Sequence, residues 1–287
     1  MTTAPEPADN RAALWDAEER ARARAARIEA VARWLVPIAV VFATLGLWQW
    51  FVVANEVPHY ILPSPVRVWQ QLVEDRAILG DALLVTLRIT LMALAVAVIG
   101  GVLLAILFDQ SRFAELVFYP YAVILQVTPI VSIAPLIFIY VKEPTARVLI
   151  CAWIVAFFPI LSNTTLGLKS TDHNLRDLFS IYGASRLQRL LFLQLPSAMP
   201  YFLGGLRIAG GLALIGAIVA EYVVGTGGAG SGLAFRILEA SYRLNIPRMF
   251  AALALIAVVG VAIFALTSFV SWLMLRKWHE SAMGGRT

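Results

Sequence analysis

The stretch ALLVTLRITLMALAVAVIGGVLLAILF, residues 82–108, decides the fold. Arg88 is its only charged residue, and its length exceeds the roughly 20 apolar residues that a helix needs to cross about 30 Å of hydrocarbon. Other long runs share this character, and they are Trp34–Val53, Phe113–Tyr140, Val148–Leu168, Tyr201–Val224 and Phe250–Leu275. We therefore expect an all-α fold, a polytopic membrane helix bundle with about six transmembrane helices.

The composition supports a protein that lies in a lipid bilayer. Hydrophobic residues make up 60% of the 287 residues and charged residues only 14%, whereas soluble domains carry about 25% charged residues. The net charge of +5 could suit a nucleic acid. However, the basic residues flank the apolar runs, as expected of membrane anchors that face the cytoplasm, so we expect no nucleic-acid partner.

No metal site or disulfide is expected. Cys151 is the single cysteine and lies within an apolar run, and the three histidines, His59, His173 and His279, lack metal-ligand spacing. The spans also lack the clusters of His, Asp, Cys or Ser that an integral-membrane enzyme would need. We therefore expect no catalytic residues.

Charge distribution predicts the topology. Six spans place both termini on one side, and the Lys and Arg residues assigned to that side outnumber those on the other. The positive-inside rule then makes both termini cytoplasmic, as expected of a multi-pass protein of the bacterial inner (plasma) membrane. We expect a cytoplasmic N-terminal segment over residues 1–33, helical over Arg11–Arg33, a membrane domain over 34–280 and a short cytoplasmic tail over 281–287. A short amphipathic helix is expected at Val66–Leu79.

A polar island interrupts the apolar pattern at Asn174–Pro200, NLRDLFSIYGASRLQRLLFLQLPSAMP, within a cytoplasmic loop of residues 169–200. Leu175, Leu178, Phe179 and Tyr182 have i, i+3, i+4, i+7 spacing, which predicts one apolar helical face. Asn174 is the expected N-cap.

A second short helix should follow the first at once. Gly183 stands where helices commonly end in a left-handed residue, and Ser185 with Gln188 matches the capping box S-x-x-Q. Pro196 should end this helix near Leu195. Two interpretations of the island stay open, a connecting loop that is helical and a surface gripped by another protein. Its position between membrane spans argues against a DNA-binding helix-turn-helix.

The island resembles the cytoplasmic EAA loop of ABC importer permeases, E-A-A, three residues, G, nine residues, I-x-L-P. Asp177-Leu178-Phe179 stands for E-A-A, with two bulky residues in place of alanines, while Gly183 and Leu195-Pro196 match at the same spacing. Further segments resemble the nitrate, sulfonate, taurine and pyrimidine-precursor branch, and they are Ile61–Pro65, Pro129–Leu136, Gly204–Arg207 and Ala220-Glu221. The resemblance covers about residues 34–280.

This resemblance implies a type I ABC importer permease, a homodimer that forms the pathway for a small anionic or heterocyclic solute. A soluble binding protein would deliver the solute, and a cytoplasmic ATPase would grip the loop as a coupling helix. ATP and Mg²⁺ would bind that partner, and this chain would bind no cofactor. The implied coupling residues are Asp177, Leu178, Phe179, Tyr182, Gly183, Ala184, Ser185, Leu195 and Pro196.

Polar and proline residues within the spans are candidates for the translocation pathway. A charge at bilayer depth costs roughly 2.5–3.5 kcal/mol on insertion scales, so Glu221 either lines a pathway or forms a structural pair between helices. Prolines kink helices and suit a pathway wall. The candidates are Thr128, Pro129, Ser132, Pro135 and Glu221.

Two sequence features bear on the source of energy. Residues 225–230, GTGGAG, contain G-x-G-x-x-G but follow a membrane span instead of a strand, so we expect no nucleotide there. The chain also lacks G-x-x-x-x-G-K-[ST], so an ATP-driven importer needs its ATPase in another subunit. The alternative is a secondary transporter driven by an ion gradient, which predicts inverted repeats and buried coupling carboxylates.

Overall fold

The computed structural model describes residues 8–224 and 230–276, and within them every regular element is a helix. The predicted all-α class is therefore confirmed. The chain divides after Arg67 into two compact units. Among the described residues, five helices are long and apolar enough to cross a membrane, and a bent helix pair makes a sixth crossing if it counts as one span.

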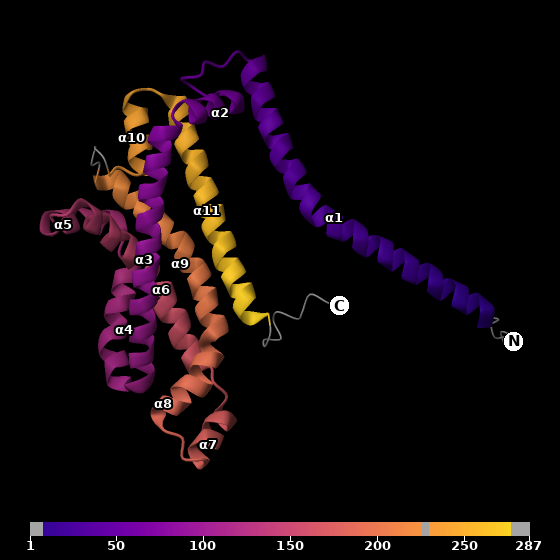
Figure 1. The fold of residues 1–287 in the computed structure, drawn as a ribbon, viewed down its shortest axis with the longest axis vertical. Helices are drawn as coiled ribbons and strands as arrows, with labels where there is room; N and C mark the ends of the chain where they lie inside the picture. Colours follow the sequence, from indigo (N-terminus) through magenta and orange to yellow (C-terminus); the bar gives the residue numbers. More distant parts are fainter. Residues whose placement is uncertain (1–7, 225–229, 277–287) are drawn as a thin grey trace. The chain divides into compact units, whose positions relative to one another are not determined.

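The first unit contains one long helix, α1, Ala8–Ala54. The predicted N-terminal helix and the first apolar run are joined in it without a break, and Val31–Ala54 is its apolar, span-length part. Pro37 lies inside the helix, and Figure 1 shows that α1 is bent along its length. Proline is a common cause of such kinks because it removes a backbone donor.

The boundary between the units falls near the start of a helix that is shorter than predicted. α2 covers Pro65–Glu74, and α3 starts at Arg76 and runs to Gln110. The expected helix Val66–Leu79 was wrong at its end, because the backbone of Asp75 leaves helical geometry (φ −96°, ψ 14°) and separates the two helices. The predicted apolar face of α2 is open, with Trp69 66% exposed, as suits a helix that rests in lipid.

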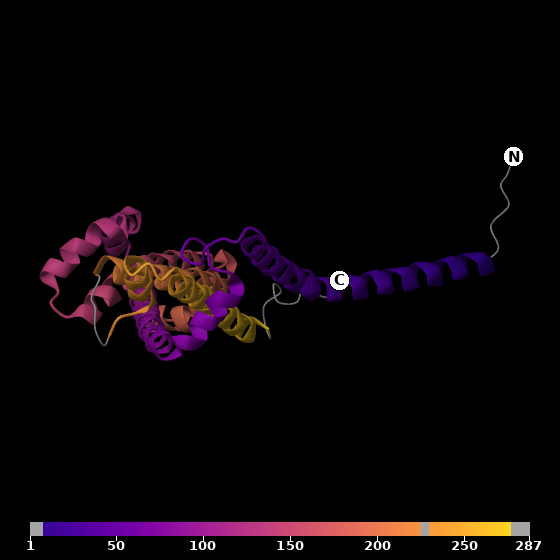
Figure 2. The same ribbon diagram turned by 90° about the horizontal axis from the view of Figure 1, so that it is seen from above.

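The third apolar run does not form one straight span. α4, Arg112–Val127, and α5, Ile130–Tyr140, meet at an angle of 105°, and Figure 2 shows this pair reaching out from the rest of the second unit. The break falls at Thr128-Pro129. A residue before proline is driven out of helical geometry, and Thr128 is extended at φ −77°, ψ 122°.

The core of the second unit is built around α6, Pro144–Lys169, which packs mainly against α9, Leu195–Val224, and α3. Small residues allow the close approach. A Cβ added to Gly205 on α9 would lie 2.8 Å from the carbonyl oxygen of Pro159 on α6. Glycine and alanine serve this purpose at interfaces between membrane helices, where backbone contact supplies the packing energy.

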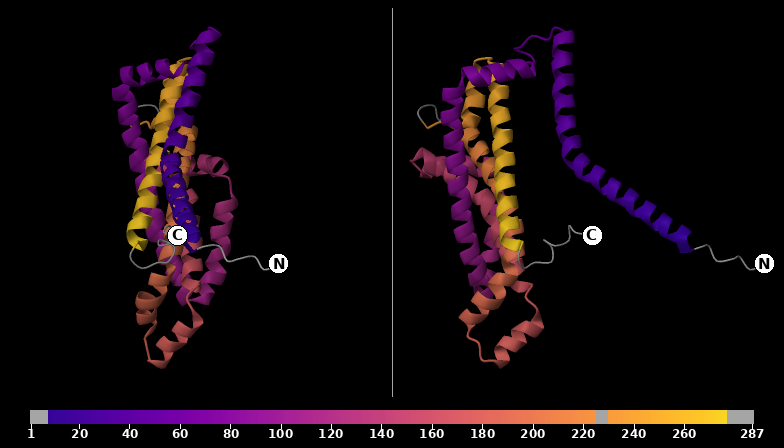
Figure 3. Two further views of the ribbon diagram at one scale, coloured as in Figure 1. Left: turned by 90° about the vertical axis from the view of Figure 1, so that its right-hand side faces the viewer. Right: turned by 45° about the vertical axis from the view of Figure 1, so that its right-hand side comes forward.

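The two ends of this bundle differ. α7, His173–Ile181, and α8, Arg186–Arg189, project from the end toward which α11, Ile246–Leu275, runs (Figures 1 and 3). α10, Leu233–Tyr242, lies at the opposite end (Figure 1). The polar island and the end of α11 thus share one side of the second unit.

Candidate coupling segment and translocation groove

The polar island forms the helix–turn–helix that the sequence predicts, with one change at its start. Asp172, and not Asn174, is the N-cap of α7, and its side chain accepts a hydrogen bond from the backbone N–H of Asn174 at 2.7 Å. At the other end Gly183 is left-handed, with φ +68°, as predicted. The N–H of Ala184 donates to the carbonyl of Phe179 at 2.9 Å, which closes the last turn of the helix.

The second short helix begins with the predicted capping box. The N–H of Gln188 donates to Oγ of Ser185 at 3.2 Å, and the N–H of Ser185 donates to Oε1 of Gln188 at 2.8 Å. Two backbone donors that a helix start leaves without partners are thereby satisfied. The turn between α7 and α8 is therefore fixed by its own sequence.

The expected end of this helix near Leu195 was wrong. A π-helical turn, Leu190–Gln194, joins α8 to α9 without a gap, and the N–H of Leu195 reaches back five residues to the carbonyl of Leu190. Pro196 has no N–H to donate, and a wider turn lets the chain pass it without breaking. The helical rod of residues 186–223 thus runs from the island into the membrane.

An apolar groove of about 570 Å³ lies in the angle between α7 and α8. Large apolar side chains around it are open, with Tyr182 82% and Phe192 70% exposed. The groove is lined by Leu178, Phe179, Tyr182, Gly183, Ala184, Gln188 and Phe192. Asp177 and Ser185, two further predicted coupling residues, are exposed on the same hairpin but do not line it.

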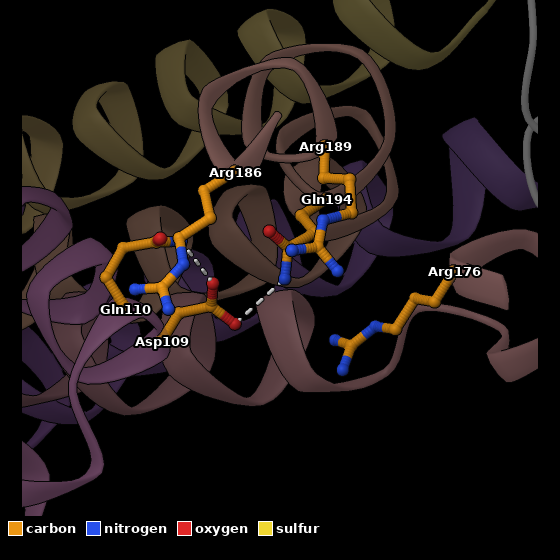
Figure 4. A pocket seen from close by; sticks show the side chains of 6 residues that line it. All are labelled: Asp109, Gln110, Arg176, Arg186, Arg189 and Gln194. Carbon is orange, nitrogen blue, oxygen red and sulfur yellow. Dashed lines mark hydrogen bonds between the residues drawn. The ribbon is translucent and has the colours of Figure 1, made fainter. Parts of the chain in front are cut away.

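Polar contacts fix the hairpin to the membrane helices. Arg176 of α7 donates to the carbonyl of Leu168 on α6 at 2.8 Å. Lys169, the last residue of α6, in turn forms an ion pair with Glu115 of α4. Gln194 donates to Asp109 at the end of α3 at 2.9 Å (Figure 4). The segment of residues 173–194 is thus tied directly to α6 and α3.

A second groove lies beside the break between α4 and α5. It has a volume of about 330 Å³ and is lined mostly by apolar residues, including Thr128 and Pro129 with Pro159 of α6 and Leu212 of α9. Oγ1 of Thr128 donates to the carbonyl of Ile124 at 2.6 Å. The structure thus brings two of the five predicted pathway residues together.

The other three predicted pathway residues do not line this groove. Ser132 and Pro135 are exposed on α5, and Glu221 is 5% exposed in the interior. Glu221 accepts hydrogen bonds from Oγ1 of Thr86 on α3 at 2.8 Å and from the N–H of Ala234 on α10 at 3.1 Å. These contacts favour the structural pair, one of the two alternatives for Glu221; a place in the pathway stays a prediction.

Sequence reasoning missed the partners of Glu221. Thr86 lies in the run that defined the fold and also accepts a hydrogen bond from the N–H of Leu233 at 2.9 Å. A Cβ added to Gly232 would lie 2.1 Å from the carboxylate of Glu221. A hydroxyl within an apolar run was the only signal of this contact available in the sequence.

In the part of the chain that the structure describes, no group of three or more His, Cys, Asp or Glu residues could hold a metal ion. Residues 225–229 of the glycine-rich motif lie outside the described residues.

Comparison with known proteins agrees with the resemblance to ABC importer permeases. The family described as "Binding-protein-dependent transport system inner membrane component" matches residues 97–278. A probable ABC transporter permease protein of Haemophilus influenzae is 33% identical over 85% of this chain and 97% of its own length. The formylaminopyrimidine transport permease protein ThiX of Halalkalibacterium halodurans is 32% identical over 72% of this chain and 81% of its own. Its name fits the pyrimidine-precursor branch that the sequence indicates.

A solved structure supports the fold. The crystal structure of an amino acid ABC transporter with histidines matches with a TM-score of 0.59 and 19% identity, over 70% of this chain and 96% of the other. At this identity the likeness concerns the arrangement of helices alone.

Proposed function

The chain belongs to the family of binding-protein-dependent transport system inner membrane components and is a permease subunit of an ABC importer, and from this we propose that residues 173–194 are the joint through which a cytoplasmic ATPase drives it. The observation that carries the proposal is the open apolar groove between α7 and α8. An apolar groove on a polar projection suits docking to a partner protein. The ion-gradient alternative has no support from these comparisons.

The segment is built to transmit force. Its N-terminal helix is tied to α6 through Arg176 and Leu168, and its C-terminal helix continues into α9. A rigid helix pair passes a displacement into the bundle, where helices move as packed bodies. ATP and Mg²⁺ bind the partner, and this chain itself makes and breaks no covalent bond.

The assembly follows from the same proposal. Two copies of this chain form a homodimer, two ATPase subunits engage their hairpins, and a soluble binding protein docks on the opposite face. The bent α4–α5 pair counts as one crossing, so six crossings place both termini on one side, and the positive-inside rule makes that side cytoplasmic. The end of α11 lies on the same side as α7 and α8 (Figure 3), which supports the C-terminal half of this topology.

The pathway runs along the groove beside Thr128 and Pro129, between α4–α5 and the α6–α9 core. Its solute is small and anionic or heterocyclic, a class that the name of the formylaminopyrimidine relative supports. Uptake of candidate solutes into proteoliposomes with the binding protein and the ATPase present would identify the substrate.

Gly183 offers the sharpest test of the joint. Its φ of +68° disfavours side chains, whereas a Cβ there would meet nothing of this chain within 4 Å, so within the permease a substitution acts through the backbone alone. Gly183→Val should distort the turn, because β-branched residues rarely adopt this conformation. Gly183→Asn is the matched control, because asparagine tolerates it.

Both variants are compared in proteoliposomes that contain the ATPase and the binding protein. We expect Gly183→Val to lose substrate-stimulated uptake while the ATPase retains basal hydrolysis, and Gly183→Asn to keep most of its uptake. Normal coupled uptake by Gly183→Val would overturn the proposal.

A further inference from the structure

We infer that a cavity of about 240 Å³ between the end of α3 and the hairpin α7–α8 is a binding site for a phosphate-type oxyanion. The cavity is lined by polar and charged residues, and they are Asp109, Gln110, Arg176, Arg186, Arg189 and Gln194. Its volume is several times the roughly 30 Å³ that a water molecule occupies in the liquid. A phosphate group therefore has room to enter.

The charges around the cavity favour an anion. Three guanidinium groups face one carboxylate, and Figure 4 shows Arg176, Arg186 and Arg189 extending toward the Asp109–Gln194 hydrogen bond from different sides. Like charges gathered in one concave site attract a counter-ion. The planar fork of arginine matches the geometry of phosphate oxygens, with two parallel hydrogen bonds.

The one carboxylate in the cavity does not occupy the hydrogen-bond donors of the arginines. The Asp109 oxygens accept hydrogen bonds from the side-chain amides of Gln110 at 2.8 Å and Gln194 at 2.9 Å. Among the described residues, neither Arg186 nor Arg189 has a side-chain hydrogen bond or an ion pair with a protein group.

Arg176 is held at the wall of the cavity by a protein contact. Its Nη2 donates to the carbonyl of Leu168 at 2.8 Å, so the guanidinium from α7 is fixed at a cavity that α8 also lines. An oxyanion between the arginines would reach donors on α7 and α8 and would hold the hairpin against the end of α3.

The oxyanion could come from either of two sources, a soluble phosphate compound or the headgroup of an anionic phospholipid. Both can be tested on the full-length permease purified alone in a maltoside detergent, which contains no phosphate. Inorganic phosphate is titrated against chloride at constant ionic strength, and Tm is followed because a ligand of the native state raises it. In a second arm, phosphatidylglycerol is added to the micelles in place of phosphate.

The variants are Arg186→Gln and Arg189→Gln, and Arg112→Gln is the matched control. Arg112 follows closely after the end of α3 and is exposed, but it does not line the cavity. We expect saturable stabilisation of the native chain by phosphate, or by phosphatidylglycerol if the headgroup is the ligand. Each cavity variant should weaken the apparent affinity at least tenfold, and Arg112→Gln should bind like the native chain.

Equal Tm values in phosphate and chloride, with no effect of phosphatidylglycerol, would overturn the inference. Cavity variants that respond to phosphate like the native chain would also overturn it. So would variants that weaken only assembly with the ATPase, because that result would mean that the arginines bind an acidic surface of the partner. Arg186→Lys, which keeps the charge without the fork, covers the case in which Arg186→Gln fails to fold, and should bind more weakly than the native chain. The test needs no ATPase, so its result is independent of the coupling role.

Discussion

Thr86 on α3 donates a hydrogen bond to the carboxylate of Glu221 on α9, with 2.8 Å between the two oxygen atoms. The same two side chains receive the first backbone N–H groups of α10, from Leu233 and Ala234. Gly232, the N-cap of α10, makes no side-chain cap of its own. Glu221 and Thr86 therefore cap α10 from neighbouring helices and fix its position against them.

Gly232→Ala should break the hydrogen bonds that join Glu221 to Thr86 and to the start of α10. The added Cβ would lie 2.1 Å from the Glu221 carboxylate, and the carboxylate could move only by giving up its hydrogen bonds. We expect a loss of about 1–3 kcal/mol in the free energy of unfolding, as for other overpacked interiors, measured by thermal unfolding in detergent.

Gly230→Ala is the control for this substitution, because a Cβ there would meet nothing within 4 Å. It should leave Tm unchanged. Thr86→Val combined with Gly232→Ala should cost less than the sum of the single changes, since both remove the same hydrogen bonds. Additive effects would show that Gly232 and Thr86 act independently.

Gly205 and Gly204 test the packing of α9 on α6. A Cβ at Gly205 would meet the Pro159 carbonyl at 2.8 Å and Cβ of Asn163 at 2.9 Å, whereas one at Gly204 would meet nothing within 4 Å. Gly205→Ala should therefore lower the free energy of unfolding by about 1–3 kcal/mol.

Gly204→Ala, at the adjacent position of the same helix, should be neutral or stabilise by up to about 1 kcal/mol, because alanine favours helix over glycine. Thermal unfolding of the two variants side by side checks this. Equal destabilisation by both would contradict the packing described for α6 and α9.

Substitutions of Arg248 and Arg243 compare the contribution of a largely buried ion pair with that of an exposed one. Arg248 at the start of α11 makes two hydrogen bonds with Asp75, at 2.6 and 2.7 Å, and Asp75 is 8% exposed. Removing one member of a fully buried pair typically costs about 3–5 kcal/mol. Because this pair is part-buried and Asp75 keeps a hydrogen bond from Gln71, Arg248→Ala should cost less than that and still lower Tm.

Arg243 pairs with Glu239 at 2.9 Å, and its side chain is 67% exposed. Exposed pairs contribute about 0–1 kcal/mol, so Arg243→Ala should change Tm little. The same scan at raised salt should leave the difference between the variants in place, because buried pairs are screened less than exposed ones. A small effect of Arg248→Ala would place Asp75 in a wetter environment than the structure shows.

Local chemistry made much of this structure predictable. The apolar runs predicted the long helices, because their length must match the bilayer. The left-handed Gly183 and the Ser185 capping box were also predictable, since each depends on residues within one turn of the chain.

The errors came from competition between local signals and from distant contacts. Pro129 predicted a break in the helix but not its angle of 105°. Pro196 does not end its helix, because a π-helical turn before it lets the helix continue. The contact of Thr86 with Glu221 joins residues 135 positions apart. No periodicity or motif within either helix specifies such a partner.

The most direct test of the coupling segment is cross-linking from Tyr182, with Tyr242 as control. The two tyrosines are 82% and 81% exposed and lie near α7 and at the end of α10, at opposite ends of the second unit (Figure 1). The native Cys151 is buried, so Tyr182→Cys and Tyr242→Cys can each carry a photoreactive maleimide label in the assembled transporter. We predict a covalent adduct with the ATPase from position 182 and none from 242. An adduct only from 242, or from neither position in an assembly that hydrolyses ATP and transports, would contradict the account.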